Sequence, residues 1–158
     1  MYDFKTFAQM NLDLIFQGYD RMPEPGEEVF ARRFTMQLGG GPMVCPIVLD
    51  QLGCKVELGT FLGKGEVTEI CLRLLEKRGF RAYRSFPSPR EDPVVVTAVF
   101  SGPRDRGFLA HNEQVYESCL PEETVFQYLR DARVVFAPVG HPGVTRRLHE
   151  AGVKIVFD

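Results

Sequence analysis

The sequence predicts an α/β protein with a parallel sheet covered by helices on both faces. Extended apolar runs alternate with helical patterns of roughly 10 residues, and short Gly or Pro connections join them. Two further extended runs interrupt this alternation, which predicts a small additional sheet projecting from the α/β core. The chain has 158 residues, no internal repeat and no linker, so we expect one domain with one core.

The first half of the chain is predicted to contain two extended segments before its first helix. In chain order the predicted elements are the strand Asn11–Phe16, the extended segment Val29–Leu38, the helix Pro42–Leu52, the strand Val56–Phe61 and the helix Val67–Arg78. Pro42 suits the first helical position because its missing N–H costs little there. Gly53 and Gly79 end the two helices.

The second half is predicted to begin with a hairpin and to continue as alternating helices and strands. Two extended runs flank the turn-rich sequence SGPRDR, and two helix-strand pairs follow. The predicted elements are the strands Val94–Phe100 and Gly107–His111, the helix Pro121–Arg130, the strand Val134–Val139, the helix Val144–Ala151 and the strand Val153–Phe157. Because its residues are mainly apolar, we expect the last strand to be a buried central one.

The charge balance and the cysteine pattern exclude several classes of function. With 19 basic and 21 acidic residues, the chain lacks the positive surface that nucleic acid or an anionic membrane requires. The N-terminus shows no signal peptide, and no run of about 20 apolar residues occurs, so we expect a soluble cytoplasmic protein. The four cysteines form no CxxC pair and have no histidine at ligand spacing, so we expect neither a metal site nor a redox dithiol.

Asn11 and Asp13 are candidate ligand-binding residues because they lie two positions apart in a predicted strand. Residues at this spacing point to the same face. A carboxylate accepts hydrogen bonds and an amide both donates and accepts, which suits the paired hydroxyls of a sugar or another polyol. The alternative is that both residues simply begin or border the strand.

The glycines at 39–41 are a second candidate feature. Their bare backbone would let a ligand approach the N–H groups at the start of the following helix. The sequence is not a Walker loop, and GGGPMV also lacks the GxGxxG pattern of a dinucleotide site. A flexible turn is the alternative here. The three histidines are scattered without an evident partner, so no catalytic residue is predicted.

The ordered set of motifs resembles the N-terminal half of the PfkB (ribokinase) family of carbohydrate kinases. The set comprises Asn11-x-Asp13, Pro25-Gly26-Glu27, Gly39-Gly40-Gly41-Pro42, LDQLGCKVELGTFLGKG, VVVTAVF, ARVVFAPVGHP and GVKIVFD, and it covers residues 1–158. The resemblance implies a Rossmann-like, ribokinase-like core with a small β lid, whose strands would lie near 29–38 and 94–111. It also implies that Asn11 and Asp13 contact substrate hydroxyls and that Gly39, Gly40 and Gly41 line the sugar pocket.

The resemblance further implies a sugar kinase of which this chain supplies the substrate-binding half. Complete family members use ATP and Mg²⁺, and their second half carries the catalytic base, so we expect a truncated chain that binds no nucleotide productively. The β lid often mediates dimerisation in this family, which implies a homodimer. The alternative is a non-catalytic remnant that binds sugar or dimerises. That alternative is favoured by Val44, which stands where the family usually has Asn.

Overall fold

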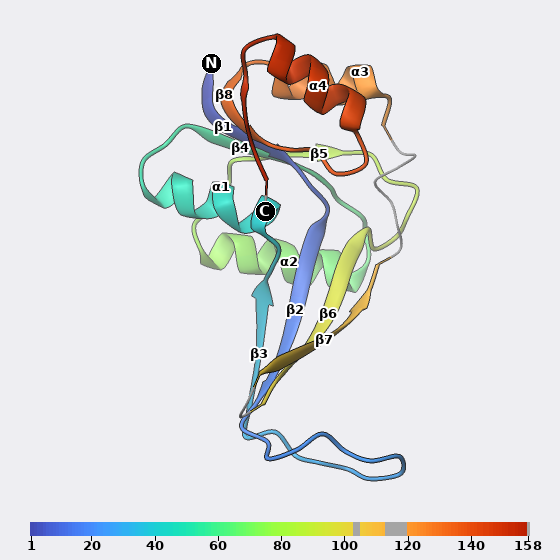
Figure 1. The fold of residues 1–158 in the computed structure, drawn as a ribbon. Helices are drawn as coiled ribbons and strands as arrows, with labels where there is room; N and C mark the ends of the chain where they lie inside the picture. Colours follow the sequence, from blue (N-terminus) through green and yellow to red (C-terminus); the bar gives the residue numbers. More distant parts are fainter. Residues whose placement is uncertain (103–104, 113–119, 158) are drawn as a thin grey trace.

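The computed structural model describes residues 1–102, 105–112 and 120–157, which form two sheets and four helices (Figure 1). The strands are β1 (Tyr2–Phe7), β2 (Met10–Gln17), β3 (Arg33–Leu38), β4 (Val56–Phe61), β5 (Tyr83–Phe86), β6 (Val94–Ser101), β7 (Arg106–His111), β8 (Ala132–Phe136) and β9 (Lys154–Val156). The helices are α1 (Gly41–Gln51), α2 (Glu66–Lys77), α3 (Glu122–Leu129) and α4 (Pro142–Glu150). None of them has both the length and the apolar character needed to cross a membrane.

The main sheet has five strands in the order β5-β4-β1-β8-β9, and every neighbouring pair is parallel. Its central strand is β1, which pairs with β4 on one side and with β8 on the other. Strands of this sheet are connected through helices, as parallel pairing requires. The predicted α/β class is therefore confirmed.

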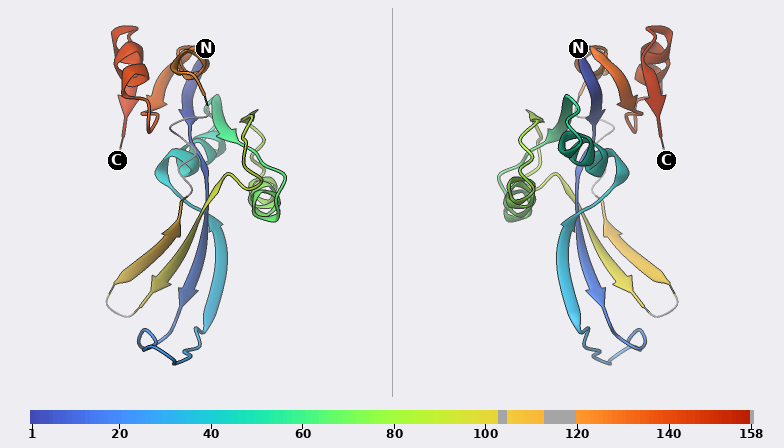
Figure 2. Two further views of the ribbon diagram at one scale, coloured as in Figure 1. Left: turned by 90° about the vertical axis from the view of Figure 1, so that its right-hand side faces the viewer. Right: turned by 90° about the vertical axis from the view of Figure 1, so that its left-hand side faces the viewer.

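Helices cover both faces of the main sheet, and each face has its own apolar core (Figure 2). On one face α1 and α2 pack against residues such as Phe4 and Leu58. On the other face α3 and α4 pack against residues such as Phe7 and Phe61. Successive side chains of a strand point to opposite faces, so β1 contributes to both cores.

The second sheet has four strands in the order β3-β2-β6-β7 and projects away from the helices (Figures 1 and 2). Only Ala8 and Gln9 separate β1 from β2, so the first segment of the chain passes directly from one sheet into the other. One face of this sheet carries Phe34, Phe16 and Phe100 side by side, with ring centroids 5.0 and 6.0 Å apart. The opposite face carries Asn11 and Asp13.

Several predicted boundaries and one assignment are corrected by the structure. The segment predicted as the first strand is β2, in the second sheet, and the actual first strand is β1. Its sequence YDFKTF places polar residues among apolar ones, and Lys5 is buried there only because partners from distant segments satisfy it. The short strand β5 also escaped prediction, since three of its four residues are exposed. Of the extended segment 29–38, only Arg33–Leu38 is a strand.

The last strand differs most from the prediction. β9 lies at an edge of the main sheet, with β8 as its neighbour, and two of its three residues are exposed. Phe157 beyond it is also exposed. The prediction of a buried central strand is therefore wrong for this chain, because hydrophobic composition does not reveal how many neighbours a strand has.

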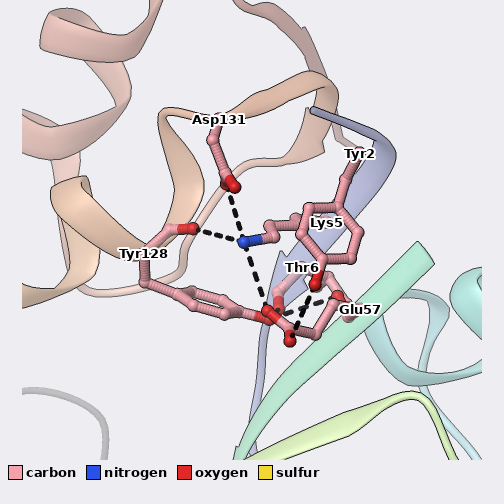
Figure 3. Close-up of polar contacts among 6 residues, drawn as sticks. All are labelled: Tyr2, Lys5, Thr6, Glu57, Tyr128 and Asp131. Atoms are coloured by element: carbon pink, nitrogen blue, oxygen red, sulfur yellow. Dashed lines mark hydrogen bonds and ion pairs between the residues drawn. The ribbon is translucent and has the colours of Figure 1, made fainter. Parts of the chain in front are cut away.

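A buried lysine connects three segments of the fold at the centre of the main sheet (Figure 3). Lys5 Nζ lies 3.2 Å from Glu57 Oε2 and 2.7 Å from Asp131 Oδ1, and it donates a 3.0 Å hydrogen bond to the Tyr128 carbonyl. It also lies over the ring of Tyr2, 4.1 Å from the centroid. All of the ammonium group's donors are thus matched, which is what burial of a charge requires.

The hydroxyl of Tyr128 extends the same cluster. It is placed to donate to the carbonyl of Thr6 at 3.3 Å or to that of Glu57 at 3.2 Å. Burial, with a smaller contribution from the Glu57 charge, raises the pKa of Tyr128 far above its ordinary value. The phenol therefore stays protonated and joins α3 to the backbone of β1 and β4.

Candidate functional site

The candidate site begins at the glycine turn between β3 and α1. The N–H of Gly39 donates to the carbonyl of Asn11 at 2.9 Å, which holds the turn against β2. A Cβ atom on Gly39 would overlap the carboxyl group of Asp13, so only glycine permits this approach. Gly40 has φ +80, in the left-handed region that favours glycine. Glycine is therefore favoured at position 39 by the close approach of Asp13 and at position 40 by the backbone conformation.

Asn11, Asp13 and Thr97 form a hydrogen-bonded group beside this turn. The amide of Asn11 donates to Asp13 Oδ1 at 3.1 Å, and the hydroxyl of Thr97 donates to Asn11 Oδ1 at 3.2 Å. Thr97 lies on β6 opposite Asp13 in the parallel pairing of β2 and β6. These bonds fix the orientation of the Asn11 amide and leave Asp13 Oδ2 without a side-chain hydrogen-bond partner among the described residues.

The carboxyl group of Asp13 is partly shielded from water. Burial raises its pKa above the ordinary value, and the hydrogen bond from Asn11 partly opposes this shift. An ionised carboxylate in such a place gains from any donor that reaches it, and bonds to ionised acceptors are stronger than those between neutral groups. Hydroxyl groups of a ligand would supply such donors.

A small cavity of about 220 Å³ lies next to this group. Its lining includes Asn11, Gly39, Gly40, Pro42 and Gln9. The cavity adjoins the end of β1, and ligands of open α/β sheets commonly bind at the carboxyl ends of the strands. α1 has no side-chain N-cap. In its first turn Pro42 has no N–H and the N–H of Met43 donates to the carbonyl of Gly40 at 3.1 Å, so the N–H of Gly41 is the one left there for a ligand oxygen.

The structure brings most of the predicted site residues together. Asn11, Gly39 and Gly40 line the cavity, and Asp13 lies beside it, where it accepts a hydrogen bond from Asn11 and packs against Gly39. Gly41 is the first residue of α1 and does not line the cavity. Val44 lines a different groove. Sequence reasoning missed two residues, and each had a detectable signal.

The two missed residues are Gln9 and Thr97. Gln9 precedes Asn11 by two positions and therefore extends the spacing of Asn11 and Asp13 by one step. Thr97 is the single polar residue of the apolar run VVVTAVF, on the strand that pairs with β2. A polar residue at such a position needs a hydrogen-bond partner, which Asn11 provides.

A second glycine turn, Gly63-Lys64-Gly65, has a structural role. The carboxyl group of Asp92 accepts hydrogen bonds from the N–H and the hydroxyl of Thr68, at 2.8 and 2.9 Å, in the first turn of α2. A Cβ atom on Gly65 would overlap Asp92, and one on Gly63 would overlap the carbonyl oxygen of Glu91. Both glycines therefore allow the segment 91–92 to pack against the start of α2.

The largest groove, of about 1,010 Å³, lies apart from this site. It runs between α1 and the strands β8 and β9, and its lining is mainly apolar. Charged side chains such as Asp3 and Arg133 lie at this groove, where they pair with each other at 3.3 Å. In the described ranges there is no group of three or more His, Cys, Asp or Glu side chains that could hold a metal ion. The small cavity, which adjoins the hydrogen-bonded group of Asn11, Asp13 and Thr97, is the better candidate for a specific ligand.

The sequence matches no protein-family model and no curated protein. Solved structures nevertheless share the fold. Ribokinase from Arabidopsis thaliana, complexed with ribose and ATP, is 14% identical with a TM-score of 0.70, and the match covers 99% of this chain and 53% of that one. Fructokinase from Halothermothrix orenii is 18% identical with a TM-score of 0.72, covering 99% and 56%. Nucleoside kinase from Burkholderia thailandensis in complex with inosine is 16% identical with a TM-score of 0.69, covering 98% and 52%.

These similarities confirm the predicted ribokinase-like fold. The chain spans about half the length of the kinases it matches.

Proposed function

We propose that this chain supplies the sugar-binding part of an ATP-dependent kinase that acts on a sugar or a related small alcohol. The observation that carries the proposal is the Asp13 carboxyl group, which is partly buried, held by Asn11 and packed against the bare backbone of Gly39. The ribokinase-like fold supports it, since the matched structures include a ribokinase and a fructokinase.

In this proposal Asp13 accepts hydrogen bonds from two neighbouring hydroxyls of the sugar. Asn11, already oriented by Thr97, contributes its amide to the same hydroxyls. Gly39 and Gly40, which line the cavity, let the sugar ring come close to the main chain, as glycines allow where a ligand approaches it. Water would be displaced from a carboxylate that is already partly desolvated, which reduces the cost of binding.

Phosphoryl transfer requires more than this site offers. The reaction needs a positioned nucleotide, charge neutralisation around the phosphates and an oriented nucleophile. The described residues do not fit a Mg²⁺ site, since they contain no cluster of suitable ligands. We therefore derive no catalytic step from this chain, and we propose that ATP and Mg²⁺ act only in the complete enzyme.

A second candidate function is a non-catalytic module that binds sugar or forms a homodimer. The second sheet favours it, because Phe34, Met36 and Leu109 are exposed on the same face of its strands, where α2 lies only beside Met36 among the three. An apolar face of this kind usually marks a contact with another protein. Sedimentation of the chain would show a mass of twice 17.9 kDa if this face joins two copies. A monomer at high concentration would contradict that assembly.

The sugar-binding proposal is tested by calorimetric titration of the chain with D-ribose and D-fructose. Asp13→Ala removes the acceptor and should weaken binding by about 10- to 100-fold, the value of a charge-assisted hydrogen bond or two. Asp20→Ala is the matched control, because Asp20 is exposed on the loop after β2. Equal affinity of the native chain and Asp13→Ala would contradict the proposal.

The same samples also test whether this chain by itself has kinase activity. We expect sugar binding without turnover, so no ADP should form when ATP, Mg²⁺ and sugar are added together. Sugar-dependent ADP release by this chain would overturn the expectation that it lacks the catalytic machinery.

A further inference from the structure

The side chain of Gln9 is buried without a hydrogen-bond partner. It lies in the two-residue connection between β1 and β2 and is 4% exposed. Neither its Oε1 nor its Nε2 has a partner in the part of the chain that the structure describes. An unpaired polar group in the interior destabilises the folded state, and such groups are rare in native proteins. A retained cost of this kind calls for an explanation.

Gln9 lines the same cavity as Asn11, Gly39 and Gly40. The remaining buried side-chain atoms without partners belong to Thr6, Thr60 and His141, and none of these residues lines the cavity. Gln9 is thus the residue whose unused donors and acceptor coincide with a space that a ligand could enter. It also continues the row of polar residues at positions 9, 11 and 13.

We propose that Gln9 is a specificity-determining residue that hydrogen-bonds a further hydroxyl group of a monosaccharide, beyond the pair taken by Asn11 and Asp13. This inference rests on the proposed sugar-binding function. A carboxamide both donates and accepts, and a sugar hydroxyl does the same, so one hydroxyl or a neighbouring pair satisfies both ends of the side chain. Sugar binding then removes the destabilisation that the unpaired Gln9 side chain causes in the ligand-free protein.

The size of the cavity selects the class of ligand. Its volume of about 220 Å³ lies below the range of roughly 300–1,000 Å³ that is usual for drug-sized ligands. A single sugar ring fits this limit better than a nucleoside, which adds a base to the ring. We therefore expect Gln9 to contribute to the recognition of free monosaccharides rather than of inosine.

The test combines two substitutions with a small panel of ligands. Gln9→Leu keeps the volume of the side chain and removes its hydrogen-bonding groups, and Gln9→Met does the same with a more flexible chain. Gln51→Leu, at the exposed end of α1, is the matched control. Binding of D-ribose, D-fructose, their single-deoxy analogues and inosine is measured by calorimetry, and thermal unfolding of every variant is recorded.

We expect Gln9→Leu to weaken binding of the preferred sugar about 10-fold and to raise the unfolding temperature of the ligand-free chain. It should also abolish the preference for the parent sugar over one deoxy analogue, which identifies the hydroxyl that Gln9 contacts. A lower unfolding temperature in both Gln9 variants would show that the amide is satisfied in the free protein and would overturn the proposal.

The remaining outcomes separate this inference from the function on which it rests. If Asp13→Ala weakens sugar binding and neither Gln9 variant does, the role of Gln9 is wrong and the sugar site stands. If the native chain binds none of the monosaccharides, both fail. Tighter binding of inosine than of either sugar would contradict the size argument.

Discussion

The first 13 residues of the chain contribute to two polar clusters, one around Lys5 and one around Gln9, Asn11 and Asp13. The clusters differ in how many of their polar groups have hydrogen-bond partners. At Lys5, two carboxylates and a carbonyl surround the ammonium group within 3.2 Å. At Gln9, four residues later, neither end of the amide has a partner among the described residues. Asp13 in the same group receives one side-chain hydrogen bond, from Asn11.

The difference indicates separate roles. A buried group that is fully paired stabilises one arrangement of the chain, and here it joins β1, β4 and α3 (Figure 3). A buried group that stays unpaired gains from a ligand, at a cost that the rest of the fold must offset. The Lys5 cluster therefore stabilises the fold, whereas we propose that the cavity beside Gln9 binds a ligand.

The largest effect is expected from replacing Lys5, which tests whether its cluster stabilises the fold. Lys5→Met leaves the carboxylates of Glu57 and Asp131 without their shared cation, so we expect the free energy of unfolding to fall by about 3–5 kcal/mol. Urea unfolding measures this change, and Lys77→Met on the exposed side of α2 serves as the control. Sugar affinity of the folded fraction should be unchanged. A loss below about 1 kcal/mol would contradict this stabilising role.

Adding Glu57→Gln to Lys5→Met tests the cause of this destabilisation. If the destabilisation comes from an unpaired buried carboxylate, the double variant should recover part of the lost stability. No recovery would mean that the contacts of the lysine with the Tyr2 and Tyr128 rings matter more.

Substitutions in the two glycine turns, at 39–41 and 63–65, are expected to have effects of intermediate size on stability. Gly63→Ala forces a Cβ atom into the main-chain oxygen of Glu91, which cannot move freely, so we expect a loss of about 1–3 kcal/mol in the free energy of unfolding. Gly39→Ala meets only the side chain of Asp13, which can rotate away. It should therefore cost less stability and weaken sugar binding by about 10-fold. Denaturation and calorimetry of both variants check this, and equal effects on stability would contradict it.

The smallest expected effect on stability comes from the pH dependence at Asp13. Its pKa is raised in the folded chain, so the folded state holds the proton more tightly than the unfolded state does. Stability therefore falls as the pH rises from the ordinary carboxyl range through the raised pKa of Asp13, and the penalty is fully present above that pKa. Asp13→Asn should slightly raise the midpoint of urea unfolding at pH 7 and lose this advantage in acid.

Sugar binding should depend on pH in the opposite sense. Because the ionised carboxylate accepts the hydroxyl protons, affinity should decrease as the pH is lowered through the raised pKa of Asp13. Titrations between pH 7 and pH 4 measure this dependence. A binding curve that is flat in this range would exclude Asp13 as the acceptor.

Much of the fold follows from local patterns in the sequence. Strand β4 and all four helices were predicted within one or two residues, since Gly53 and Gly79 follow the ends of α1 and α2, Pro121 directly precedes α3 and Pro142 is the first residue of α4. The pairing of Asn11 with Asp13 and the glycine turn were visible as well, because spacing along a strand and a bare backbone are local properties. The assignment of these residues to a sugar remains a proposal.

Tertiary structure decided what local patterns could not express. Lys5 and Gln9 are both polar residues in the mainly apolar stretch FKTFAQM, so the sequence does not reveal which of them finds partners. The difference arises because the carbonyl that Lys5 reaches belongs to Tyr128, 123 positions away, while no described segment brings a partner to Gln9. The edge position of β9 likewise depends on strand order in the sheet. Periodicity determined which residues are extended or helical, and only the folded chain determined which polar groups are paired.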